Sequence, residues 1–376
     1  MLLHSGLHAS LVKIHRSIQF APAFPYAWDD KTRRVHIIRE QQLWKLWLII
    51  ILGLLIINCY ALREYINQWD FVNANTQVSS ILALSVVSIV QWFLCDRAES
   101  SAKFLNGMLD MEAEIGRKGF VVQEMKIPKL ICEILVHIEA ITPIFVGIGS
   151  GLMPCSPPNL IVPLNPSCSH TGKKILDSKS ILSKCIEFIL LSTLNGIFWK
   201  AALGIGTAWT IHILVGCQSQ CLALKKLERY PGFNGRIQLL NIMFNEVYVG
   251  TVFVVVAGCS CALTAFAYAL LQIYISPSDF PVPVIIWFLL MLVDSSIVLL
   301  YISKIAGSVF SISKDMLQKQ HSALSASARG RLQRRVLNSW KPIKVSFGLC
   351  NFIDDKTPLK LLEFSVARFV DLILMD

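Results

Sequence analysis

Charged residues are scarce in this chain. Asp, Glu, Lys and Arg make up 16% of the 376 residues, whereas soluble domains carry about 25%. Hydrophobic residues make up 54%, and they gather in long runs that are nearly free of charge, as a bilayer core requires. The scarcity of charge excludes the two or three soluble domains that this length would otherwise suggest. It indicates an all-helical membrane protein.

Motifs for catalysis are lacking as well. The chain has no Gly-rich phosphate loop, no His-Glu-x-x-His and no serine elbow. Glu133, His137 and Asp294 are the candidates for intramembrane chemistry, but their predicted depths differ. We therefore expect no enzyme, no cofactor and no metal site. The net charge of +10 does not indicate a nucleic-acid partner, because the basic residues cluster between alternate hydrophobic runs.

Seven hydrophobic runs predict seven transmembrane helices, with ends accurate to several residues. The seventh run gives the weakest signal, because four charged residues lie within it. The predicted spans are Leu43–Ala61, Val78–Cys95, Leu130–Leu152, Ile189–Cys217, Val247–Ile275, Val282–Ile302 and Leu359–Met375.

The distribution of lysine and arginine predicts the orientation in the membrane. One set of connections holds 26 of these residues and the opposite set holds five. Because cytoplasmic connections are enriched in Lys and Arg, we expect a cytoplasmic N-terminus and an extracellular C-terminus. A G-protein-coupled receptor, another seven-helix class, would have its N-terminus outside. The basic connections are 1–42, 96–129, 218–246 and 303–356, and the others are 62–77, 153–188 and 276–281.

The runs divide the chain into four parts. We expect a cytoplasmic N-terminal segment (1–42) and a six-helix transmembrane bundle with cytoplasmic helical extensions (43–302), one of which continues the fourth run over Gln218–Tyr230. The bundle includes an outer loop, 153–188. A basic cytoplasmic helical region that anchors subunits (303–356) and a seventh helix (357–376) follow.

Two parts of the chain carry recognisable short motifs. Near the start, Phe20–Tyr26 is a Pro-aromatic stretch and Asp29–Arg34 is a polar-basic one. Further on, Ser339–Pro342 forms a Ser-x-x-Pro motif and Gly348–Phe352 forms a Gly-x-x-x-Phe motif. These motifs resemble those of the insect gustatory and odorant receptor superfamily, and its gustatory branch more closely, in which stretches similar to the first two precede the first helix.

The superfamily's hallmark is Thr-Tyr, five apolar residues and Gln, and it falls on residues 368–375. Here Arg368 and Phe369 replace Thr-Tyr, Asp371 occupies an apolar position and Met375 replaces Gln. The resemblance implies a tetrameric, non-selective cation channel with a ligand pocket in the outer half of the bundle. Its seventh helix would line a central pore with Arg368, Phe369, Asp371, Leu372 and Met375. Asp371 follows Arg368 by three residues on the same helix face and would neutralise it.

Ionisable residues inside the runs need partners or water, because an unpaired charge in a bilayer is costly. Glu133 and His137 share a helix face. They are either polar ligand contacts or, as we favour, boundary residues that reach hydrated regions. We expect Glu139 to be an internal hydrogen-bond partner. Asp294 and Lys200 are candidates for an ion pair across two helices.

Aromatic residues and cysteines supply the remaining candidates. Apolar pockets for small organic ligands are lined by such aromatic side chains, although each of these residues also suits helix packing. The candidate pocket residues are Trp199, Trp209, Phe266, Tyr268 and Trp287. Cys155 and Cys168 lie in the predicted outer loop, where they either form a disulfide or remain free thiols.

The features together predict a multi-pass chemosensory receptor of the plasma membrane. We expect a channel opened by a small organic ligand, surrounded by membrane lipid and assembled as a homo- or hetero-tetramer with related subunits. Two alternatives are a non-conducting scaffold or auxiliary subunit of such a channel, and a secondary transporter. No internal repeat supports a transporter built from inverted halves.

Overall fold

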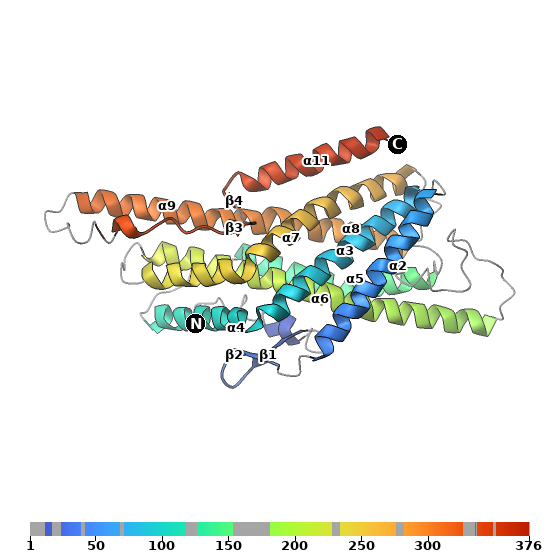
Figure 1. Cartoon of the computed structure of the whole chain (residues 1–376), viewed down its shortest axis with the longest axis horizontal. Helices are drawn as coiled ribbons and strands as arrows, with labels where there is room; N and C mark the ends of the chain where they lie inside the picture. Colours follow the sequence, from blue (N-terminus) through green and yellow to red (C-terminus); the bar gives the residue numbers. More distant parts are fainter. Residues whose placement is uncertain are drawn as a thin grey trace.

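The computed structural model describes residues 12–16, 24–38, 42–67, 71–117, 126–152, 181–227, 234–275, 282–325, 335, 337–348 and 351–375. Nearly all of them are helical (Figure 1). In chain order the elements are β1 (Tyr26–Asp29), β2 (Arg34–Ile37), α2 (Gln42–Asn67), α3 (Phe71–Asp96), α4 (Ala98–Arg117), α5 (Lys126–Leu152), α6 (Ile181–Leu227), α7 (Asn234–Ile275), α8 (Val282–Ile297), the π-helical η4 (Val298–Ile302), α9 (Ser303–Ser325), β3 (Ser346–Phe347), β4 (Asn351–Phe352) and α11 (Thr357–Met375).

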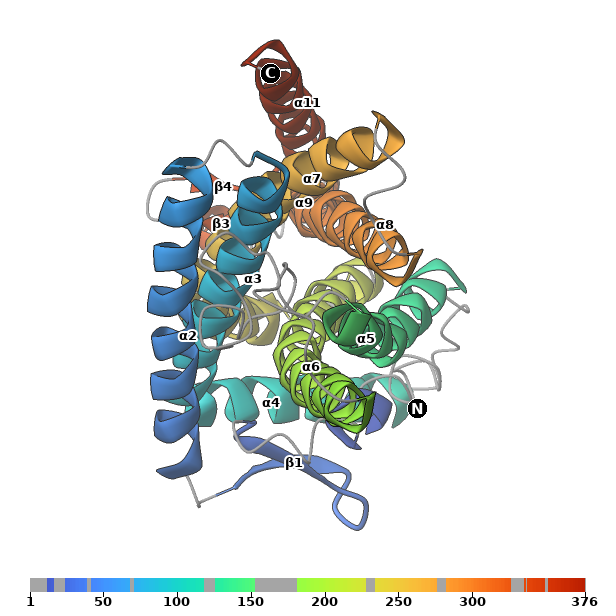
Figure 2. The ribbon, with the colours of Figure 1, turned by 90° about the vertical axis from the view of Figure 1, so that its right-hand side faces the viewer.

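The long helices form a bundle in which α6 lies centrally (Figure 2). α5 packs along α6, α3 packs along α7, and α7 also contacts α8. α5 and α6 approach each other closely. A Cβ atom added at Gly147 of α5 would lie only 2.6 Å from the backbone oxygen of Ser192 of α6. Small residues serve this role in membrane helix pairs, where the backbones must come together without a hydrophobic driving force.

Five described helices are long and apolar enough to cross a membrane, and α3 with α4 counts as a sixth if the two form one span with a 77° bend. The chain is therefore a multi-pass membrane protein. α11 does not meet this test, because its 19 residues include four charged ones. The seventh crossing and the orientation of both termini stay predictions.

α6 is much longer than the predicted fourth span. It has 47 residues, so it extends over about 70 Å, whereas the hydrocarbon core of a bilayer is about 30 Å thick. The predicted helical continuation over Gln218–Tyr230 is confirmed as far as Leu227. The helix therefore continues well beyond the membrane.

The end of the predicted outer loop, 153–188, is wrong. α6 begins at Ile181, so residues 181–188 form its first turns rather than part of a loop. The segment includes Lys184, but one lysine near a helix end is compatible with a helix because it can extend its ammonium group to water. Cys155 and Cys168 lie outside the described residues.

One end of the bundle consists of α4, α9, the end of α6 and the start of α7 (left in Figure 1), and we call it the basal end. Its core is aromatic. The rings of Phe104 and Phe244 are 5.5 Å apart, and those of Trp209 and Tyr248 are 5.9 Å apart. The hydroxyl groups of Ser101 and Tyr248 lie 3.0 Å apart and join α4 to α7. These helical extensions agree with the predicted helical connections.

The N-terminal segment packs under this end. The β1–β2 hairpin lies against α4, where the side-chain amide of Asn106 bonds both the N–H and the C=O of Val35 at 3.0 Å. A second contact joins His15 to α6, because its Nε2 lies 2.9 Å from Nε2 of His212. Both rings are buried. The segment is therefore held by a histidine pair as well as by the hairpin.

α11 stands apart from the bundle (Figure 2) and contacts α7, η4 and α9. Ser365 is its one buried residue among those described. The Ser365 hydroxyl lies 2.6 Å from the Ser260 hydroxyl, and Thr264 donates a hydrogen bond to the Ser365 carbonyl at 3.2 Å. α7 therefore carries the main attachment of α11.

The connection that leads into α11 is fixed to α7 and α9. The side chain of Asn245 bonds the Lys344 carbonyl and the Ser346 N–H, both at 2.8 Å. Gly348 follows β3 with φ +65°, a conformation that glycine adopts at no steric cost. A Cβ atom at Gly307 would lie 2.6 Å from the Asp354 carbonyl, so α9 meets this connection without a side chain between them.

Candidate functional site

A cavity lies inside the bundle between α3, α5, α6, α7, α8 and η4. Its volume is about 110 Å³, several times the about 10–15 Å³ that one water needs. Its lining comprises Leu82, Ala83, Val86, Val87, Val90, Leu135, Trp199, Ala202, Leu203, Gly206, Thr207, Thr210, Val255, Gly258, Cys259, Ala262, Phe266, Met291, Asp294, Ser295 and Val298.

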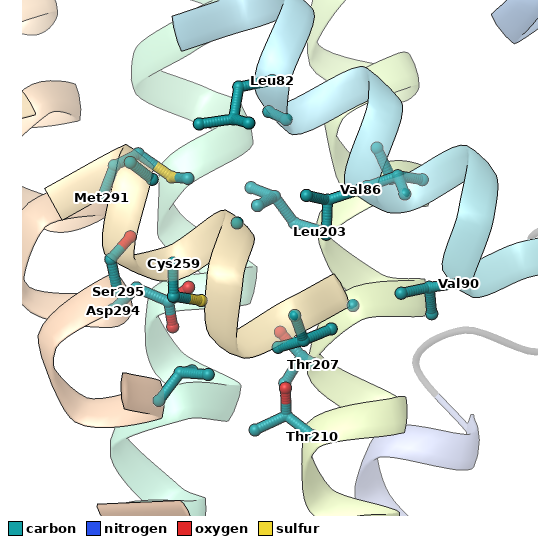
Figure 3. A pocket seen from close by; sticks show the side chains of 18 of the residues that line it. Leu82, Val86, Val90, Leu203, Thr207, Thr210, Cys259, Met291, Asp294 and Ser295 are labelled. Carbon is teal, nitrogen blue, oxygen red and sulfur yellow. The ribbon is translucent and has the colours of Figure 1, made fainter. Parts of the chain in front are cut away.

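The lining is mostly aliphatic, with a few polar groups. In Figure 3, Asp294, Ser295 and Cys259 lie on one side of the cavity, Val86 and Val90 of α3 lie on the other, and Thr207 and Thr210 of α6 lie between them. Small-molecule sites typically combine an apolar wall with a few placed polar groups that orient the ligand. The cavity has this chemistry.

Glycine residues of α6 and α7 help to create the space. A Cβ atom at Gly206 would meet nothing within 4 Å, so this position faces open volume. A Cβ atom at Gly258 would lie 2.4 Å from Cγ2 of Val86, so glycine lets α7 pack against α3 there. The cavity therefore depends on missing side chains as much as on those present.

Asp294 carries the one charged side chain of this described lining. No described residue forms an ion pair or a hydrogen bond with its carboxyl group. The predicted ion pair with Lys200 is wrong, because Lys200 donates to Oε1 of Glu139 at 2.5 Å instead. Glu139 lies on α5, the neighbour along which α6 packs most closely, whereas Asp294 lies on α8. Glu139 is thus confirmed as an internal partner.

Three of the five candidate aromatic residues form one cluster. The ring of Trp287 lies 6.0 Å from the rings of both Trp199 and Phe266. Trp199 and Phe266 line the cavity, and Trp287 packs behind them. The other two lie elsewhere: Trp209 belongs to the basal core, and the Tyr268 hydroxyl accepts a hydrogen bond from Gln272 at 2.9 Å.

Glu133 and His137 do not reach the cavity lining. Both side chains are exposed on α5, and Nδ1 of His137 lies 2.6 Å from the backbone oxygen of Glu133. Lys129 approaches the Glu133 carboxylate at 4.0 Å. These positions agree with the interpretation of boundary residues.

The residues predicted to line a pore lie along α11. Arg368 and Asp371 form an ion pair at 2.8 Å, as expected of two residues three apart on one helix face. Phe369 and Leu372 are partly buried, and the Met375 side chain lies outside the described part. No pore can be described from one chain, and the role of these residues stays a prediction.

Sequence reasoning missed most of the lining. The signals were small or hydroxyl-bearing residues at helical spacing, such as Thr207 and Thr210 on α6 and Gly258 and Ala262 on α7. Within the described residues, no group of three His, Cys, Asp or Glu side chains could hold a metal ion.

The fold has solved counterparts. The structure of the insect olfactory receptor OR5 from Machilis hrabei in complex with eugenol matches with a TM-score of 0.62 at 12% sequence identity, over 100% of both chains. A second structure of that receptor matches with a TM-score of 0.56 at 11% identity, over 97% of both chains. No protein-family model and no curated protein matches the sequence. At this identity the likeness shows the fold alone.

Proposed function

We propose that this chain is a subunit of a ligand-gated, non-selective cation channel that serves chemosensation at the plasma membrane. The observation that carries the proposal is the apolar cavity between α3 and α6–α8, whose α7 wall is also the attachment of α11. The shared fold with an olfactory receptor, one of whose structures holds eugenol, supports a small organic ligand. The sequence resemblance favours the gustatory branch.

The geometry of α7 supplies a route from ligand to pore. Gly258, Ala262 and Phe266 lie four residues apart on the face of α7 that lines the cavity. Ser260 and Thr264 lie between these residues in the sequence and form hydrogen bonds with Ser365 of α11. A ligand that favours one packing of α7 against α3 shifts the population toward it, and α11 moves with α7.

The gate in this proposal is a narrow point of the α11 helices from four subunits. Phe369 and Leu372 provide apolar side chains for a constriction that closes by dewetting. The ion pair of Arg368 with Asp371 removes the net positive charge that would repel cations. Related subunits would complete the tetramer.

Membrane lipid would contact the outer surface of the bundle. Leu46, Ile49 and Ile56 of α2 are 55%, 65% and 71% exposed, and α2 packs mainly against α3. An apolar helix face of this kind is stable in hydrocarbon and costly in water.

A non-conducting auxiliary subunit is the second candidate. The exposed Arg368 side chain at the hallmark position favours it, because a guanidinium group is never deprotonated in proteins. In this case the chain would assemble with conducting partners and add no conductance of its own.

Whole-cell recording tests the channel proposal. Cells that express the chain, alone or with related subunits, should respond to an organic ligand panel with a cation current, and Leu372→Ala should alter the gating of that current. The matched control is Leu374→Ala, since Leu374 is 80% exposed. Verified surface expression with no current in any combination contradicts conduction. A current that needs a partner subunit and is unaffected by Leu372→Ala favours the auxiliary role.

A further inference from the structure

Asp294 lies in the cavity without a cation. It comes from α8, and its neighbours in Figure 3 are the thiol of Cys259 and the hydroxyl of Ser295. Neither is a base that would neutralise a carboxylate. No Lys, Arg or His side chain belongs to the described lining.

Lys200, the base that the sequence offered as a partner for Asp294, is already engaged. Its Nζ lies 2.5 Å from Oε1 of Glu139, whose side chain is 1% exposed. Removing Lys200 from that contact would leave Glu139 buried and unpaired, which is more costly than leaving the pair intact. Asp294 therefore has no basic partner among the residues that the structure describes.

An ionised carboxylate in an apolar, membrane-depth cavity needs a partner or bulk water. The cavity walls supply three side-chain hydroxyls, from Thr207, Thr210 and Ser295. A divalent ion such as Ca²⁺ takes about six to eight oxygen ligands, which this wall does not provide. An organic cation needs fewer oxygen ligands, because burial of its apolar part against the aliphatic and aromatic walls also favours binding.

We propose that the cavity selects small lipophilic amines, whose protonated nitrogen pairs with Asp294 while the apolar part packs between Val86, Trp199 and Phe266. This inference rests on the proposed function, namely that the cavity is the ligand site. The ammonium group donates charge-assisted hydrogen bonds, which are about twice as strong as neutral ones. A phenol or an alcohol of the same shape forms neutral bonds and binds more weakly.

The test compares three probes of one shape: 2-phenylethylamine, 2-phenylethanol and propylbenzene. Binding is measured by equilibrium dialysis on the full chain purified in detergent, so that conduction is not required. The amine should bind at least about tenfold more tightly than the alcohol, because a hydrogen bond to a charged group contributes more than a neutral one. The alcohol should bind no more weakly than the hydrocarbon.

Two variants of the chain then test whether Asp294 is responsible for tighter binding of the amine. Asp294→Asn should lower amine affinity by about 10- to 100-fold and change alcohol affinity less than about threefold. Glu133→Gln, which removes an exposed acid of α5 outside the lining, should change neither. The comparison of probes on the unmodified chain remains decisive if Asp294→Asn does not fold.

The outcomes separate this inference from the channel proposal. Any of three results overturns the inference. The amine binds no more tightly than the alcohol, its affinity is unchanged in Asp294→Asn, or no probe binds at millimolar concentration. Amine binding that depends on Asp294 but evokes no current supports the inference and contradicts conduction. Currents evoked equally by all three probes support the channel and overturn amine selection.

Discussion

Lys200 on α6 donates a hydrogen bond to Glu139 on α5, with 2.5 Å between Nζ and Oε1. The two residues differ in exposure: the Glu139 side chain is 1% exposed and the Lys200 side chain is 39% exposed. The pair joins the two helices that pack most extensively in the bundle. It also leaves Asp294 without a basic partner.

This asymmetry predicts unequal costs for breaking the pair. Lys200→Met leaves the Glu139 carboxyl fully buried without a partner, whereas Glu139→Leu leaves a Lys200 side chain that is already partly exposed. Lys200→Met should therefore lower the free energy of unfolding more, up to the about 3–5 kcal/mol that breaking a fully buried pair costs. Thermal unfolding in detergent measures both variants.

The double variant, Glu139→Leu with Lys200→Met, provides the control. It should regain most of the stability lost in Lys200→Met, because replacing both ions by apolar groups of similar size is often neutral. Equal losses in the two single variants would contradict the assignment of the pair.

Filling the cavity should block ligand responses without unfolding the bundle. Gly206→Leu places a side chain where nothing lies within 4 Å of the added Cβ, and leucine favours a helix more than glycine does. The ligand concentration for half-maximal current should rise at least about tenfold, equivalent to about 1.4 kcal/mol of binding. Gly53→Leu is the matched control, because Gly53 of α2 is equally open but lies outside the lining.

Acid should loosen the N-terminal segment. Burial lowers the pKa of His15 from 6.5 to about 4, so the folded state binds this proton less readily than the unfolded state. The stabilisation is complete above pH 6.5 and is lost as the pH falls from 6.5 toward 4, by at most about 3 kcal/mol.

Comparing His15→Phe with the unmodified chain tests this. The difference in melting temperature between them should shrink as the pH falls from 7.5 to 4.5, because only the unmodified chain has His15 to protonate. His321→Phe on α9 replaces an exposed histidine and should show no such trend. A constant difference in the His15 series would show that the pair contributes nothing to pH dependence.

The entry to α11 should depend on Asp354. Its Oδ1 accepts hydrogen bonds from the Thr357 hydroxyl at 2.7 Å and the Lys356 N–H at 3.1 Å. The bond from Thr357 lowers the pKa of the Asp354 carboxyl below its usual value of 3.8. The stabilisation is therefore present above pH 3.8 and is lost as the pH falls below it.

Asp354→Ala should lower the free energy of unfolding by about 1 kcal/mol, as removal of a helix cap typically does. Asp354→Asn keeps an acceptor oxygen and should lose less, without the acid dependence. Thermal unfolding from pH 7 to pH 3 distinguishes the two variants. Identical curves for Ala and Asn would contradict the role of the side-chain oxygen.

Hydropathy predicted the helices well where the membrane alone determines them. It predicted the start of α2, the end of α7 and the start of α8 to within one residue, whereas α7 begins at Asn234, well before the predicted Val247. It could not show that α6 begins at Ile181 or that α8 continues through η4 into α9, because hydropathy indicates burial in the bilayer and not how far a helix continues beyond it. The contact of His15 with His212 joins residues 197 positions apart, and one sequence carries no signal for such a pair.

The candidate site was harder to predict than the fold. The residues predicted to line the pocket were large aromatic ones, yet Trp209 and Tyr268 pack outside the cavity lining. The space itself arises where Gly206 and Gly258 lack side chains, and a sequence does not show which helix faces meet. The partner of Lys200 was misassigned for the same reason, since depth along a helix does not determine which neighbour lies beside it.

The central claim is that α11 from four copies lines a pore at the centre of an assembly. Electron cryomicroscopy of the purified full-length protein in lipid nanodiscs tests it most directly. The account predicts particles with four-fold symmetry, or pseudo-four-fold symmetry with related subunits, in which α11 surrounds the axis and Phe369 and Leu372 face it. Monomeric particles, or oligomers in which α11 lies at the lipid-facing periphery, would contradict it.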